Sequence, residues 1–287
     1  MELIFAAAIC SVAVSVLLKF CKEKGLNTFH MIAWNYAAAS VLCFLWFKPD
    51  LQHISVEHTP WWLILILGML LPAIFLCLAK SLQTAGILKT EIAQRLSVVL
   101  SLSAAYFIFQ EQFSSLKILG IILGVAAVLC ILLSGRLGQD SLEQTSSSGG
   151  VFLAAVWGGY ALIDVLLKYT TGLGLQFSVA LNLIFIYAFV LSIVYTTVRF
   201  KSFGSLRAIV AGLGLGILNF ANIALYIKAH MLLKDSPAIV FAGMNILVVM
   251  FGVLSGIFIF KEKLKSMTSV GLVLGVASVL CLAYAMV

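Results

Sequence analysis

The chain alternates between long apolar runs and short polar connections. Ten apolar runs recur from one end to the other, each close to the ~20 residues that a helix needs to cross a bilayer. They are residues 3–20, 29–47, 61–82, 87–109, 116–134, 151–169, 177–198, 208–229, 237–260 and 267–287. The pattern predicts an all-α polytopic membrane protein with ten transmembrane helices. Because ten is even, both termini are expected on the same side.

Composition excludes the soluble classes. The chain is 63% hydrophobic and 10% charged, with a mean hydropathy of +1.15, whereas soluble domains are about 45–50% apolar and about 25% charged. The connections leave no room for an extramembrane catalytic domain. The basic residues are scattered over many loops, so no nucleic-acid partner is expected and lipid is the surrounding medium. No enzyme, cofactor or metal motif is found, and the four histidines are dispersed.

The two halves of the chain resemble each other. Residues 107–130 and 258–281 are identical at 13 of 24 positions at a constant offset of 151. This similarity predicts a first five-helix repeat at 1–134, a polar linker at 135–150 and a second five-helix repeat at 151–287. Since five is odd, the second repeat enters the membrane from the opposite side. The result is an inverted repeat of the kind that alternating-access carriers use.

The distribution of Lys and Arg predicts an orientation. The connections after spans 1, 3, 5, 7 and 9 hold ten basic residues, and the other side holds three. The positive-inside rule places the ten in the cytoplasm and both termini outside.

These features resemble the drug/metabolite transporter superfamily, in its EamA-like ten-span branch. The resemblance rests on the segments Phe107–Glu111 and Phe258–Glu262, the pairs Gly120/Gly124 and Gly271/Gly275, and Trp157-Gly158. It implies spans arranged around a central cavity, lined mainly by spans 1, 3, 4, 6, 8 and 9, with spans 5 and 10 peripheral. It also implies a multi-pass protein of the bacterial inner membrane. Relatives of this architecture often keep their termini in the cytosol, opposite to the charge count, and we keep the count.

Two spans carry polar and aromatic residues on one helical face. At ~100° per residue, the spacing puts each group within one side of its helix. A lipid-facing Asp costs ~2.5–3.5 kcal/mol at the centre of a span, so these faces should line a cavity or bond to neighbouring helices. The substrate-binding candidates on them are Trp157, Tyr160 and Asp164 in span 6 and Asn219, Asn222 and Tyr226 in span 8.

Further candidates come from spans 4 and 9. Gln94 and Arg95 lie deep in span 4, where Arg95 either lines a cavity or pairs with Glu91 one turn earlier. Asn245 in span 9 completes the set. Asp164 is the deepest acidic residue, and it either couples transport to a cation or forms a structural pair with Lys168.

The sequence thus predicts a secondary active transporter and no enzyme. The expected cargo is a small polar metabolite, an amino acid or related zwitterionic or anionic solute, exported by alternating access with proton coupling at Asp164. Efflux of lipophilic cations and a non-transporting structural or receptor role are the alternatives. The glycine pairs let spans 5 and 10 pack on their own halves or across a homodimer.

Overall fold

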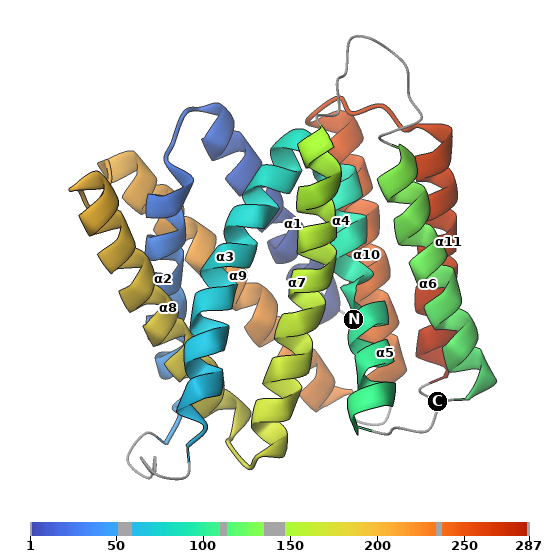
Figure 1. Cartoon of the computed structure of the whole chain (residues 1–287), viewed down its shortest axis with the longest axis horizontal. Coiled ribbons are helices and arrows are strands. Elements are labelled where there is room, and N and C mark those ends of the chain that lie inside the picture. The colour runs from blue at the N-terminus through green and yellow to red at the C-terminus, as the bar shows by residue number, and fades with distance from the viewer. Residues whose placement is uncertain (1, 51–58, 110–113, 135–146, 234–236, 286–287) are drawn as a thin grey trace.

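The computed structural model describes residues 2–50, 59–109, 114–134, 147–233 and 237–285, and their regular secondary structure is helical. Figure 1 shows the helices side by side in one bundle. They are α1 (Glu2–Glu23), α2 (Thr28–Phe47), α3 (Trp61–Thr84), α4 (Ile87–Arg95), α5 (Ser97–Phe109), α6 (Ser115–Ser134), α7 (Ser147–Gly172), α8 (Phe177–Phe200), α9 (Leu206–Leu232), α10 (Pro237–Phe258) and α11 (Ser266–Tyr284). Nine of them are long and apolar enough to cross a membrane.

The tenth crossing is made by two short helices. The sequence predicted one continuous span at 87–109, and this detail is wrong, because the span breaks at Leu96 into α4 and α5. In Figure 1 the two follow one another along a single crossing. The all-α polytopic architecture is confirmed. The last four residues of the expected linker, 147–150, begin α7.

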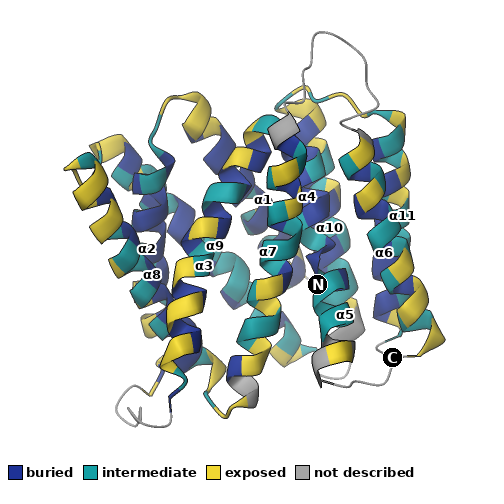
Figure 2. Ribbon diagram, viewed as in Figure 1, coloured by how far each residue is buried: buried dark blue, intermediate teal, exposed yellow. Residues whose placement is uncertain are grey.

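The connections fall on two sides. In Figure 1 the C-terminal ends of α1, α3, α6, α8 and α10 lie at the upper end of the bundle, and those of α2, α5, α7, α9 and α11 lie at the lower end. We call the upper end the basic end, because nine of the ten basic residues counted above lie in or beside the helix ends there, and the tenth, Arg136, lies outside the described residues. The outer faces of the bundle carry exposed apolar side chains (Figure 2), among them Val198 and Tyr284, each 75% exposed. Such a surface suits lipid.

Helices α6 and α11 stand at one edge of the bundle and pack against each other (Figure 1). A Cβ on Gly120 would lie 2.9 Å from Leu282, and one on Gly271 would lie 2.7 Å from Ile131. The Ser278 hydroxyl donates a hydrogen bond to the Gly120 carbonyl oxygen, 2.6 Å away. The glycine faces are therefore used between the two halves of one chain. Gly124 also meets its own half, since an added Cβ would lie 2.2 Å from Val99 of α5.

Candidate functional site

A cavity of about 800 Å³ lies at the centre of the bundle. Its walls come from α1, α3, α4, α5, α7, α8, α9 and α10. These include every span that the family resemblance implies, with α8 in addition. Phe75 and Phe185, whose rings both pack against Tyr36, give the cavity an apolar, aromatic wall, and Phe241 lines it from α10.

Eight of the nine residues proposed from the sequence line this cavity. They come from four helices and are far apart in the chain: Gln94, Arg95, Tyr160, Asp164, Asn219, Asn222, Tyr226 and Asn245. The ninth, Trp157, is not among the lining residues. Its indole Nε1 donates a hydrogen bond to the Leu96 carbonyl oxygen, 3.0 Å away, so its position supports the wall instead.

The helix break presents Arg95 to the cavity. Arg95 is the last residue of α4, where the partial negative charge of a helix C-terminus favours a cation. The Ser97 hydroxyl donates to the Gln94 carbonyl oxygen at 2.7 Å, and the Leu96 carbonyl oxygen accepts from Trp157 and from the Val99 backbone N–H. Together they replace bonds that the break removes from the helical pattern. Broken helices of this kind occur where the backbone lines a protein cavity.

Arg95 and Asp164 supply opposite charges to the same space. One Arg95 Nη atom donates to the Ser11 hydroxyl of α1. Asp164 on α7 is exposed, and it lines the cavity. Arg95 is the charged group that acts on the Asp164 carboxylate, and the Ser101 hydroxyl lies beside it. Arg95 is thus a charged neighbour of Asp164 in the cavity.

The three asparagine side chains that line the cavity differ in whether their hydrogen-bonding groups already have partners. Asn219 Nδ2 donates to Asn35 Oδ1 at 3.4 Å, and Asn245 Nδ2 donates to the Phe241 carbonyl oxygen in its own helix at 2.8 Å. The buried Asn222 Oδ1 accepts no hydrogen bond from the described residues. Asn222 therefore keeps an acceptor for a bound molecule. Next to it, the Tyr226 ring packs on the ring of His230, with centroids 4.6 Å apart.

The cavity reaches the lower end of the bundle. Phe177 in the first turn of α8 and Met231 near the end of α9 both line it, and the start of α8 and the end of α9 lie at the lower end in Figure 1. At the other end the lining stops at Ser15, Leu78 and Gln94, each several residues short of the basic end. The cavity thus approaches one side of the bundle and not the other.

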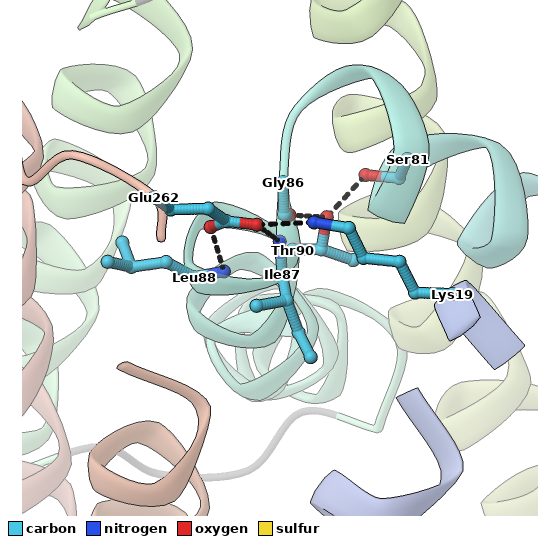
Figure 3. A network of polar contacts seen from close by, with 7 residues as sticks. All are labelled: Lys19, Ser81, Gly86, Ile87, Leu88, Thr90 and Glu262. Carbon is cyan, nitrogen blue, oxygen red and sulfur yellow. Dashed lines mark hydrogen bonds and ion pairs between the residues drawn. The ribbon is translucent and has the colours of Figure 1, made fainter. Parts of the chain in front are cut away.

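A polar cluster, which we call the closing network, lies just beyond that limit (Figure 3). Lys19 Nζ of α1 is 2.6 Å from Glu262 Oε1, and the two side chains are 11% and 18% exposed. The Glu262 carboxylate also accepts the backbone N–H groups of Ile87 at 2.7 Å and Leu88 at 3.1 Å. It therefore caps α4, whose own cap residue, Gly86, has no side chain.

A second pair of hydrogen bonds ties α3 into the closing network. Thr90 Oγ1 donates to the Gly86 carbonyl oxygen at 2.7 Å, and Ser81 Oγ lies 2.8 Å from Thr90 Oγ1 (Figure 3). Since the Thr90 hydrogen is committed to Gly86, Ser81 is the donor. Helices α1, α3 and α4 and the segment after α10 thus meet in one polar layer between the cavity and the basic end.

Sequence reasoning missed part of the site. Ser11 and Ser15 line the cavity from α1, and their spacing of four residues in an apolar helix is a signal that finds them. Glu262 pairs with Lys19 and caps α4, and these partners lie in the first half of the chain. Its counterpart in the repeat, Glu111, lies outside the described residues.

Known proteins resemble the chain at three levels. The model of the EamA-like transporter family matches residues 2–133. An uncharacterized protein of Haemophilus influenzae is 36% identical over 298 residues, which covers 99% of this chain and 97% of that protein. A protein of known crystal structure matches with a TM-score of 0.57 and 14% identity, over 98% of this chain and 99% of that one. This last likeness shows the fold alone.

Proposed function

The chain belongs to the EamA-like transporter family and is an integral, multi-pass membrane transporter, and we propose that it exports a small polar metabolite by alternating access. Members of the family are transporters and not enzymes. The proposed cargo is an amino acid or a related zwitterionic or anionic solute. The proposed location is the bacterial inner membrane, in keeping with the relative from Haemophilus influenzae.

One observation carries the cargo class: a guanidinium and a carboxylate share a single cavity. Arg95 and Asp164 line it from α4 and α7. A solute carboxylate suits Arg95, which binds it with paired N–H donors, and a solute ammonium suits Asp164. Asn222 adds an unpartnered acceptor. The apolar wall with Phe75 and Phe185 provides room for the rest of the molecule.

Alternating access is supported by the difference between the two ends of the cavity, which reaches the lower end of the bundle and is closed off from the basic end. The closing network separates the cavity from the basic end, so opening that end requires Lys19 and Glu262 to part. The packing also follows the duplication. The contact between α1 and α9 has its repeat counterpart in the contact between α7 and α3. The equivalent helices α2 and α8 contact each other, and so do α6 and α11. In an inverted repeat the two halves exchange roles between conformations. We therefore propose 1–134 and 151–287 as the two repeats.

Proton coupling is proposed through Asp164. A carboxylate that lines a partly dry cavity is neutralised by a proton, by Arg95 or by the solute. Its charge therefore depends on what the cavity holds and on which side it faces. Asp164→Asn keeps the shape of the side chain and removes this dependence.

A binding screen tests the cargo class. Purified protein is scanned by thermal shift against amino acids, organic acids and lipophilic cations, with Asp164→Asn and Arg95→Gln alongside. We expect amino acids or related solutes to raise Tm in the wild type, and both variants to lose the shift. Lys228→Gln is the control, since this exposed residue lies over the Trp46 ring and outside the cavity. Stabilisation by lipophilic cations alone, lost only in Asp164→Asn, would support drug efflux instead.

A further inference from the structure

A second carboxylate lies behind the cavity wall. Glu91 on α4 is 1% exposed and is not a lining residue. It is one helical turn before Arg95, on the side of the closing network, about 6 Å further along the helix axis. Neither of its carboxylate oxygens accepts a hydrogen bond from the part of the chain that the structure describes.

The surroundings of Glu91 offer little to a negative charge. The α10 backbone packs against Glu91 at Gly252, where an added Cβ would lie 2.8 Å from Glu91 Cγ. The Ser15 hydroxyl faces it from α1. The titratable or charged groups near it are Arg95 in its own helix and the Tyr160 phenol on α7. On the α11 side, a Cβ on Gly275 would meet apolar Leu96 and Ile92 of α4.

One cation serves two carboxylates here. Arg95 is the charged group that acts on both Glu91 and Asp164, yet it forms an ion pair with neither within the described ranges. One Arg95 Nη atom donates a hydrogen bond to the Ser11 hydroxyl, and the buried Nε atom donates none to the described residues. If both acids were ionised, the cluster would hold one uncompensated negative charge, which is costly away from water.

The geometry decides which acid is neutral. Asp164 faces the cavity, where water or a solute can reach it, whereas Glu91 is sealed between α1, α4 and α10 without a partner. A protonated carboxyl needs far less compensation than a carboxylate in such a place. Glu91 is therefore the group that holds the proton while Arg95 is bonded to Ser11.

We propose that Glu91 is a second proton-binding residue of this transporter, coupled to Asp164 through Arg95, the group that changes partner. When Arg95 turns from Ser11 to Glu91, the guanidinium stabilises the carboxylate, and the Glu91 O–H bond breaks to give the proton to water of the cavity past the Ser15 hydroxyl, which lines it. The reverse step takes the proton back from hydronium and frees Arg95. Glu91 holds its proton while Asp164 is ionised, so both acids are needed for coupling. The inference rests on the proposed proton-coupled transport.

Infrared spectroscopy of the full chain in lipid nanodiscs tests the proton directly. The carbonyl stretch of a protonated carboxylic acid is compared at pH 7 between the wild type, Glu91→Gln and Asp164→Asn. We expect the band in the wild type and in Asp164→Asn, and its loss in Glu91→Gln. A band of unchanged intensity in Glu91→Gln would overturn the proposal. This measurement needs no substrate, so it stands if the proposed cargo is wrong.

Transport in proteoliposomes tests the coupling. Glu91→Gln should exchange solute but lose the dependence of uptake on an imposed pH gradient, whereas Glu91→Asp should retain that dependence. Glu23→Gln, an exposed acid at the end of α1, is the matched control and should behave as the wild type. A merely structural Glu91 predicts the same pH profile in Glu91→Gln as in the wild type, and that result would overturn the proposal. A wild type without any pH dependence would contradict the proposed function, and the infrared band would still decide whether Glu91 holds a proton.

Discussion

The indole Nε1 of Trp157 lies 3.0 Å from the carbonyl oxygen of Leu96, at the residue where the fourth crossing breaks. This hydrogen bond joins α7 to the junction of α4 and α5. The Leu96 carbonyl oxygen also accepts the backbone N–H of Val99 at 3.0 Å, so the indole is its second donor. Trp157 thus supports the conformation that presents Gln94 and Arg95 to the cavity.

Trp157→Phe should destabilise the protein. The ring volume is largely kept while one of the two donors to the Leu96 carbonyl oxygen is lost, and a hydrogen bond contributes about 0.5–1.5 kcal/mol. We expect a lower Tm and weaker solute binding, because Arg95 loses its support. Trp34→Phe is the control: its indole donates to the Phe203 carbonyl oxygen at the same 3.0 Å, but in an exposed place. Equal losses of Tm in the two variants would contradict a special role for Trp157.

The fold was largely predictable because each membrane-spanning helix corresponds to a long apolar run in the sequence. The observed bounds of α2 and α8, for example, lie within two residues of those expected. The break at Leu96 was not predictable, since the segment contains neither Pro nor Gly and the compensating donor, Trp157, lies 61 residues away. The partners of Glu262 were missed for the same reason. A contact between the two halves leaves no local signal.

The cavity residues were predictable where polar side chains interrupt apolar helices. Asp164, Asn222 and Tyr226 stand out because exposure of such groups to lipid is costly. Trp157 shares the helical face of Asp164, and periodicity alone cannot distinguish a lining residue from one that packs on a neighbouring backbone. Asn182, another polar residue in an apolar helix, bonds to a neighbouring helix instead: its Nδ2 donates to the Ser40 carbonyl oxygen of α2 at 3.0 Å.

Gly86→Ala should disturb the closing network. Gly86 has φ +89° and ψ 164°, a region that costs other residues about 1–3 kcal/mol. An added Cβ would also lie 2.7 Å from Glu262 Oε2. Gly25→Ala is the matched control, with φ +78° and open space around the new Cβ. We expect the larger drop in Tm for Gly86→Ala, and a larger drop for Gly25→Ala would show that Glu262 does not matter there.

Loss of the Lys19 charge should open the basic end. Lys19→Met removes a part-buried, charge-assisted hydrogen bond worth about 1.5–3 kcal/mol, which corresponds to roughly a tenfold or larger change in an equilibrium. The readout is labelling of Leu78→Cys, in a background without native cysteines, by an impermeant maleimide added at the basic end. Lys24→Met, at the end of the same helix, should leave the labelling slow. Slow labelling in Lys19→Met as well would argue against the closing network as a barrier.

Gly124→Leu should separate α6 from α11. A Cβ at this position would lie 2.2 Å from Val99 and 2.8 Å from Ser278 Oγ, whereas one at Gly158 would meet nothing within 4 Å. Gly124→Leu should therefore lower Tm by more than Gly158→Leu does. Because the contact lies within one chain, the oligomeric state measured by light scattering should not change. A loss of oligomer at constant Tm would place these glycines at a subunit interface.

Flux of the solute identified by thermal shift, measured in proteoliposomes with and without a pH gradient, tests the central claim that the cavity around Asp164 carries the cargo. In the wild type, we expect the gradient to drive the solute across the membrane. Asp164→Asn, with its Tm near that of the wild type, should lose this gradient-driven flux. Transport by Asp164→Asn with an unchanged rate and pH profile would contradict the account.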